Sequence, residues 1–334
     1  MSSTLNIITV YLYRYVLPVM GILGNLGNLL SILIFIKKTW RKNVCVFYFS
    51  IYLICNTGFI NFYMLSTVFI NGYSINAQNS SVLLCKLYIY AGFLFSTLFP
   101  TILILASIDR LLISSQNVDT RLYSSKRLAY FSISISTIFW VIFFLHVLIK
   151  SSVYRLYAGF YFCYFDTTNN YVDFVSYSSL IINGLICLTI IILAIFAYKN
   201  VRRIRAIPAR QQRRQVRSMS KKDFQLLRCL YVHDIVYIVC SIPVNIYYVY
   251  ETATKNIPRT AIRSAIENFS LNFFTFLHDI PYCISFLIFL FVSRAFQTEL
   301  KRMVNMVFRR DIITIRSEEE NNVKQNAVVV VVVS

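Results

Sequence analysis

The stretch from Cys85 to Arg110 reads CKLYIYAGFLFSTLFPTILILASIDR, and it decides the fold of this 334-residue chain. It carries no charged residue between Lys86 and Asp109, and most of its positions are apolar. As a helix, the roughly 24 residues from Cys85 to Asp109 extend about 36 Å, slightly more than the ~30 Å hydrocarbon core of a bilayer. The stretch therefore predicts a membrane-crossing helix with a thiol near one surface and an Asp-Arg pair near the other.

Composition supports a protein with several such helices. Hydrophobic residues make up 57% of the chain and charged residues only 14%, whereas a soluble domain is about a quarter charged. A net charge of +19 would suggest nucleic acid for a soluble chain. Here the basic residues cluster between apolar runs, so we expect no nucleic-acid partner. Eight cysteines in this length do not indicate a disulfide scaffold.

Apolar runs long enough to span a bilayer recur along the chain, and strict period-2 alternation is absent from them. Only helices and closed barrels satisfy the backbone in lipid, so the fold class is an all-α membrane protein, a seven-transmembrane helix bundle. The predicted spans are Val10–Ile36, Val46–Ile70, Leu83–Ile113, Leu128–Ile149, Tyr171–Tyr198, Phe224–Tyr250 and Phe269–Val292.

The distribution of basic residues predicts the orientation. Of the 33 Lys and Arg residues, 26 fall in the connections on one side or at the adjoining ends of the spans, counting the segment after the last span. The positive-inside rule places that side in the cytoplasm, with the N-terminus outside and the C-terminus inside. The longest basic connection, 200–222, is expected to extend two helices, to break near Pro208, and to contact anionic lipid or a cytoplasmic partner.

The segment after the last span predicts a short amphipathic helix on the inner leaflet, in contact with membrane lipid. We expect a receptor domain over 1–308 and a disordered cytoplasmic tail over 309–334. The apolar residues at helical spacing are Phe296, Leu300, Met303, Val304 and Val307.

This topology resembles the rhodopsin-like (class A) family of G-protein-coupled receptors. The most specific marker is Asp109-Arg110-Leu111, whose distance from Cys85 is that between the family's span-three cysteine and its Asp-Arg-Tyr motif. Further matches lie in three other spans. Asn28 in span one matches the family's Gly-Asn pair, and Trp140 in span four matches its tryptophan. Cys240 and Pro243 in span six match the first and last residues of its Cys-Trp-x-Pro motif.

The chain also departs from the family pattern. Ser241 replaces the tryptophan of span six, and the family's Asn-Pro-x-x-Tyr motif is replaced by a sequence that starts at Ser285, although Pro281 supplies a helix break nearby. Span five lacks its proline. Asn56 stands where the family has an aspartate, which removes the main anionic ligand of the family's sodium site. We therefore expect weak or absent sodium binding.

The resemblance implies a plasma-membrane receptor that transmits the binding of an extracellular ligand to a heterotrimeric G protein. Asp109 can hold Arg110 by a charge-assisted hydrogen bond, and such a pair can be restrained in one state and released to a partner in another. Neither an enzyme constellation nor a metal or cofactor site is expected. The alternatives are a chemosensory receptor for small molecules and, from another class, a seven-span transporter or channel.

Two features are expected on the outer side. Cys163 lies between spans four and five, so it faces the same oxidising side as Cys85 and is expected to bond to it. The aromatic residues around Cys163 predict a hairpin lid tied to span three. Asn79, in an Asn-Ser-Ser sequence, is a glycosylation acceptor.

The ligand class follows from the resemblance only in part. Gly92 stands where amine receptors place an aspartate, which disfavours a small amine, and span seven has no lysine to hold retinal. An aromatic outer rim with a hairpin lid resembles peptide receptors, so a peptide ligand is expected. The polar residues proposed for the pocket could instead serve packing between helices, and this alternative stays open. For His233 and Asp234, in the cytoplasmic half of span six, a gating role and a packing role both stay open. The ligand-pocket candidates are Gly92, Asn245, Tyr248, Glu251, His278 and Asp279.

Overall fold

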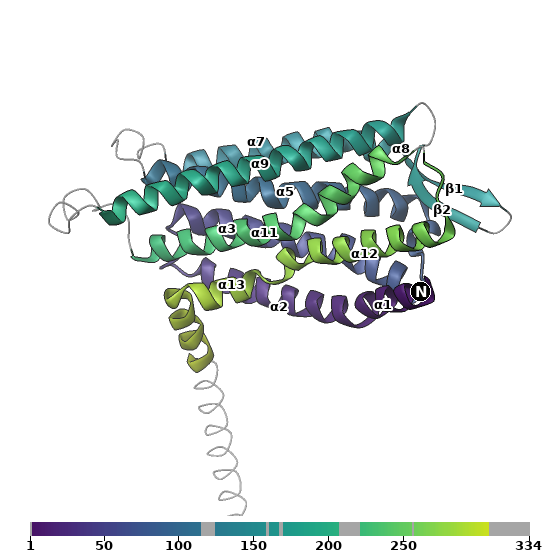
Figure 1. Cartoon of the computed structure of the whole chain (residues 1–334). Helices are drawn as coiled ribbons and strands as arrows, with labels where there is room; N and C mark the ends of the chain where they lie inside the picture. The colour runs from purple at the N-terminus through teal and green to yellow at the C-terminus, as the bar shows by residue number, and fades with distance from the viewer. Residues whose placement is uncertain are drawn as a thin grey trace, which may run out of the picture.

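The chain folds as a bundle of long, roughly parallel helices (Figure 1). The computed structural model describes residues 2–114, 124–157, 160–166, 170–206, 221–255 and 257–306. Six helical segments are long and apolar enough to cross a membrane, and α12 (Ala261–Cys283) with α13 (Ser285–Val292) makes a seventh, bent by 51°. The predicted seven-span, all-α fold is confirmed.

Spans one and two contain π-helical turns, in which the helix is locally wider because one extra residue is accommodated. The apolar pattern did not predict these turns. Span two begins at Asn43, whose side chain accepts a hydrogen bond of 2.8 Å from the Cys45 amide and caps the helix. The pieces are α1 (Ser2–Tyr11), η1 (Leu12–Val16) and α2 (Leu17–Ile36), then α3 (Val44–Phe59), η2 (Ile60–Met64), α4 (Leu65–Thr67) and η3 (Val68–Gly72).

Spans three, five and six are each one continuous helix, and span four is interrupted at Phe144 between two helical pieces. α5 covers the whole stretch from Cys85 to Arg110 as one helix, with Pro100 inside it. The short turn η4 (Ala77–Asn79) precedes it. The elements are α5 (Val82–Ser114), α7 (Lys126–Phe143), α8 (Leu145–Lys150), α9 (Tyr171–Ala206) and α11 (Lys221–Ala253).

A two-stranded hairpin covers one end of the bundle. β1 (Ser151–Tyr157) and β2 (Phe160–Phe165) pair antiparallel, with Val153 opposite Cys163. The N-terminus lies at the same end, and α13 lies toward the other (Figure 1). We call these the hairpin end and the Arg110 end.

Aromatic side chains fill the core between spans one, two, three and seven, each at most 1% exposed. One of them, Phe296, anchors the helix at 294–306, which turns away from the bundle axis (Figure 1). Lys37 reinforces that helix through an ion pair of 2.9 Å to Glu299. The core rings are Phe35, Phe49, Tyr52, Phe99, Tyr282, Phe289 and Phe296.

The helix predicted after the last span is thus present from 294 to 306. Leu300 and Met303 pack against the core, and Val304 is 41% exposed. Val307, the predicted tail over 309–334 and the predicted break at Pro208 lie outside the described residues.

Candidate functional site

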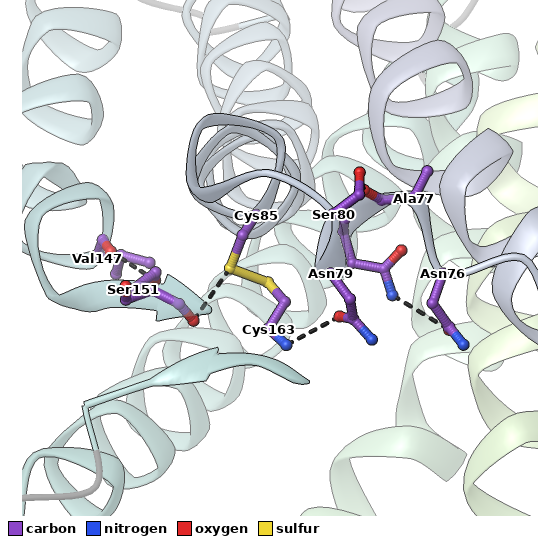
Figure 2. The surroundings of a disulfide bond; sticks show 10 residues. Asn76, Ala77, Asn79, Ser80, Cys85, Val147, Ser151 and Cys163 are labelled. Atoms are coloured by element: carbon purple, nitrogen blue, oxygen red, sulfur yellow. Dashed lines mark hydrogen bonds between the residues drawn. A yellow bond between two sulfur atoms is a disulfide. The ribbon is translucent and has the colours of Figure 1, made fainter. Parts of the chain in front are cut away.

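A disulfide ties the hairpin to α5. Cys85 and Cys163 are bonded at 2.07 Å, as predicted (Figure 2). The Cys163 amide also donates a hydrogen bond of 2.9 Å to Oδ1 of Asn79 in η4. The centre of β2 is therefore fixed both to span three and to the segment that precedes it. Glycosylation of Asn79 stays a prediction.

Below the hairpin lies a cavity of about 550 Å³ between the helices. Its wall is aromatic, with polar side chains from α9, α11 and α12. Of the predicted pocket residues, those that line it are Gly92, Asn245, Tyr248, Glu251 and His278.

The sixth predicted residue, Asp279, does not line this cavity. It is 0% exposed, and its carboxylate oxygens accept no hydrogen bond from the described residues. Nδ1 of His278 lies 4.0 Å from Oδ1 of Asp279. Asp279 therefore lies within the packed interior, whereas its neighbour His278 lines the cavity.

Tyr63 occupies the space that a side chain at position 92 would need. A Cβ built on Gly92 would lie 2.7 Å from Cδ2 of Tyr63. The Tyr63 ring stacks on Tyr88 with a centroid distance of 5.5 Å and an interplanar angle of 5°. Sequence reasoning missed this residue, and no motif marks it, because its position depends on the path of span two through η2.

Charged residues surround the mouth of the cavity. Lys255 donates a hydrogen bond to Asp173, which joins the end of α11 to the start of α9 and raises the pKa of Lys255. Arg259 lies 3.2 Å from Glu267 and 3.9 Å from Glu251. The mouth therefore presents both signs of charge.

Polar contacts in the middle of the bundle link spans two and seven. Asn56 Nδ2 donates to Ser285 Oγ at 2.9 Å, and the Tyr52 hydroxyl lies 3.1 Å from the same oxygen. Asn28 is fully buried, and its amide has no hydrogen-bond partner among the described residues. The contacts of Asn56 and Tyr52 with Ser285 hold the start of α13 against span two.

The remaining predicted residues of the middle lie in spans four and six. Trp140 Nε1 donates to Thr101 Oγ1 at 3.1 Å and so joins α7 to α5. Pro243 lies within α11, which continues through it, and Cys240 is half-buried on the same helix.

At the Arg110 end, the predicted pair is formed. Arg110 is 2% exposed and donates to Asp109 Oδ2 from Nη2 at 2.5 Å and from Nε at 3.1 Å. The Ser124 hydroxyl donates to Asp109 Oδ1 at 2.5 Å. Asp109 is thus held from two sides, and the buried guanidinium has a neutralising partner.

A second acid reaches Arg110 from another helix. Asp223 Oδ1, in the first turn of α11, lies 3.7 Å from Arg110 Nη1 and accepts a hydrogen bond from Asn43 Nδ2. Arg110, Asn43 and Asp223 line a cavity of about 430 Å³ that also contacts Trp40. Sequence reasoning missed Asp223, although a lone acid directly after Lys221-Lys222 was a signal.

Two further contacts hold α11 at this end. Gln225 Oε1 accepts hydrogen bonds from the Ala295 amide at 2.9 Å and from Ser293 Oγ at 3.1 Å. Farther along α11, Asp234 Oδ2 accepts from Ser107 Oγ of α5 at 3.2 Å. An outward movement of α11 would have to break these contacts as well as the contact between Arg110 and Asp223.

Comparison with known proteins covers most of the bundle. The family model described as 7 transmembrane receptor (rhodopsin family) matches residues 27–287. That range contains both ends of α5, the hairpin and the whole of α11. No curated protein matches the chain at a significant level. Among the described residues, no group of three or more His, Cys, Asp or Glu side chains could hold a metal ion.

Proposed function

The chain belongs to the rhodopsin family of seven-transmembrane receptors, and we propose that it couples an extracellular ligand to a heterotrimeric G protein. The observation that carries the proposal is the contact between Arg110 of α5 and Asp223 of α11. This charge pair joins a buried Arg110 to a partly buried Asp223 on another helix, and both residues line a cavity that would open if the helices separated. No catalytic chemistry is part of the proposal, in keeping with a family of receptors.

The proposed orientation places the hairpin end outside the cell and the Arg110 end in the cytoplasm, in the plasma membrane. The excess of basic residues in the connections at the Arg110 end supports it. The disulfide at the hairpin end also supports it, since disulfides persist on the oxidising side.

The proposed switch is a change in the distance between α5 and α11. While Arg110 is shared between Asp109 and Asp223, the two helices are held together at their cytoplasmic ends. Ligand that favours a state with α11 displaced shifts the population toward it. Pro243 lacks an amide donor, so the middle of α11 has a weaker backbone ladder around which the lower part can swing.

Arg110 would then be freed from Asp223 while Asp109, on the same helix, moves with it. The opened cavity would offer a guanidinium donor to the G protein. The amphipathic helix at 294–306 must part from Gln225 in the same movement.

For the ligand, we propose a peptide whose end enters the cavity under the hairpin. The mouth carries acidic and basic side chains, which suit a ligand with charges of both signs. The aromatic wall suits apolar side chains. The second candidate is a chemosensory receptor for small molecules, and the cavity volume of about 550 Å³ favours it because small-molecule sites span about 300–1,000 Å³.

The test is ligand-dependent G-protein activation in cells that express the chain. A peptide library and a small-molecule library are screened in parallel, and the responding library identifies the ligand class. Arg110→Ala should retain surface expression and lose the response to any active compound. Arg228→Ala, a basic residue on α11 outside the cavity, serves as the matched control. A normal response from Arg110→Ala would overturn the proposed coupling site.

A further inference from the structure

The side chain of Asn79 has its two ends in different surroundings (Figure 2). Oδ1 accepts a hydrogen bond of 2.9 Å from the Cys163 amide. A backbone N–H can donate only to the oxygen of an asparagine, so this contact determines which end of the amide faces β2. Nδ2, at the other end, makes no hydrogen bond to the described residues, and Asn79 is partly exposed. Nδ2 is also the atom that would carry a glycan.

The Cys163 amide lies on the outer edge of β2. Val153 of β1 is opposite Cys163 in the hairpin, yet the amide donates to Asn79 and therefore points away from β1. Cys163 is only 8% exposed, and a donor buried to this degree is unfavourable when it is left unpaired. The hydrogen bond therefore favours the orientation of β2 in which its amide meets Asn79.

The segment that carries Asn79 is itself well ordered by backbone hydrogen bonds. The Asn79 amide donates to Asn76 O at 2.9 Å in η4, and the Cys85 amide donates to Ser81 O at 3.0 Å, so the turn leads directly into α5. Cys85 then forms the disulfide to Cys163. One short segment of the chain thus holds β2 twice, through the sulfur of Cys163 and through its backbone amide.

These two attachments have different effects on β2. A disulfide joins two side chains through single bonds, about which the strand can still rotate. A second contact, made to the backbone of the same residue, restricts that rotation. Cys163, Tyr164 and Phe165 all line the cavity under the hairpin, and the Phe165 ring lies 5.9 Å from the Phe93 ring of α5, measured between centroids. The orientation of β2 therefore determines the shape of the cavity on this side.

We propose that Asn79 is a positioning residue for this cavity and that it acts through its side-chain oxygen. The oxygen orients β2 so that Tyr164 and Phe165 form the cavity wall. A glycan would replace one hydrogen on Nδ2 and leave Oδ1 able to accept, so the contact does not depend on whether Asn79 is glycosylated. The role of the side chain is thereby separate from that of the Asn-Ser-Ser sequence in which it stands.

The test is hydrogen–deuterium exchange of the Cys163 amide in the full chain, purified in detergent. Asn79→Ala removes the acceptor and should raise the exchange rate by about five- to ten-fold, as expected for one lost hydrogen bond. Ser81→Ala and Asn79→Asp abolish the glycosylation sequence but keep an oxygen at position 79, and both should exchange like the unsubstituted chain. The Asp166 amide donates to Lys150 O at 2.8 Å in the same hairpin, and as the internal control its exchange should not change.

A distance measurement separates positioning from a general loss of stability. Spin labels are attached at Phe162→Cys in β2 and Val249→Cys in α11, which are both exposed positions. The partly exposed free thiols Cys187 and Cys240 are first changed to serine. Asn79→Ala should broaden the distribution of distances between the labels, while mass spectrometry shows that the disulfide stays intact.

Two outcomes would overturn the proposal. One is an equal effect of Ser81→Ala and Asn79→Ala on the exchange rate and on the distance distribution, which would assign the effect to a glycan. The other is unchanged exchange of the Cys163 amide in a folded Asn79→Ala chain. Where Asn79→Ala does not fold, Asn79→Gln takes its place: it keeps an amide but moves the oxygen one bond farther from the backbone, and it should still raise the exchange rate. Unchanged exchange in that variant would overturn the proposal equally.

Discussion

Arg110 Nη1 in α5 lies 3.7 Å from Asp223 Oδ1 in α11, whereas Arg110 Nη2 lies 2.5 Å from Asp109 Oδ2 in its own helix. The shorter contact lies within α5, so it does not depend on the distance between α5 and α11. The longer contact joins two helices and is the one that a movement of α11 breaks. In the proposed switch, Asp223 would set how readily this end of the bundle opens, and Asp109 would keep the guanidinium ordered in either state.

Asp223→Asn should raise ligand-independent G-protein activation. The substitution removes the charge and keeps an oxygen that can accept from Asn43. Loss of one such ion pair is worth about 1 kcal/mol, which is about a five-fold change in the equilibrium between closed and open states. The measurement is basal nucleotide exchange on the G protein, normalised to surface expression.

The matched control is Lys222→Gln, a charge change on the adjacent residue, whose ammonium lies over the Trp40 ring and not against Arg110. It should leave basal activity near that of the unsubstituted chain. Equal basal activity in the two variants would argue against the role given to Asp223.

Much of the architecture could be predicted because it follows from local patterns. The length and charge distribution of 85–110 predicted α5, and the same topology brought Cys85 and Cys163 to one side. Span seven starts at Ala261, earlier than the predicted Phe269, because Arg263 and Glu267 form a 2.7 Å pair that makes charge acceptable in the first helical turns.

The contacts between spans could not be predicted in this way. Nothing in the pattern around Asp223 says that it meets Arg110, since that contact depends on how two helices more than 100 residues apart pack. The π-helical turns of spans one and two depend on tertiary packing too, and η2 of span two contains Tyr63. Asp279 was expected in the pocket from its place in span seven, yet it is fully buried and does not line the cavity.

The disulfide should be needed for both folding and ligand response. Cys85→Ser should lower surface expression, because the bond closes a loop of 78 residues and such a constraint is worth about 4 kcal/mol. Cys163→Ser and the double variant should match it, since each removes the same bond. Surface labelling and thermal unfolding of the purified protein measure the effect. Cys240→Ser, which removes a free thiol, should behave like the unsubstituted chain; an additive double variant would contradict the assignment.

Gly92→Ala should destabilise the wall of the cavity under the hairpin. The added methyl would lie 2.7 Å from the Tyr63 ring, and overpacking of this kind costs about 1–3 kcal/mol. The apparent melting temperature in detergent should fall, and adding Tyr63→Leu should recover part of the loss. Gly184→Ala is the matched control, because a Cβ there meets no atom within 4 Å among the described residues. Identical melting of the two alanine variants would show that Tyr63 does not fill this space.

Sodium should have little effect on this receptor. Asn56 replaces the family's anionic ligand and uses its amide N–H on Ser285. The Tyr52 hydroxyl lies 3.1 Å from the same Ser285 oxygen, and the Tyr52 ring packs on Phe99 with a centroid distance of 4.7 Å.

Exchange of sodium chloride for choline chloride at constant ionic strength should therefore leave thermal stability unchanged. A site half-filled by sodium would instead add about 0.4 kcal/mol. A sodium-specific rise in melting temperature in the unsubstituted chain would mean that Asn56 and its neighbours hold the ion without an acid.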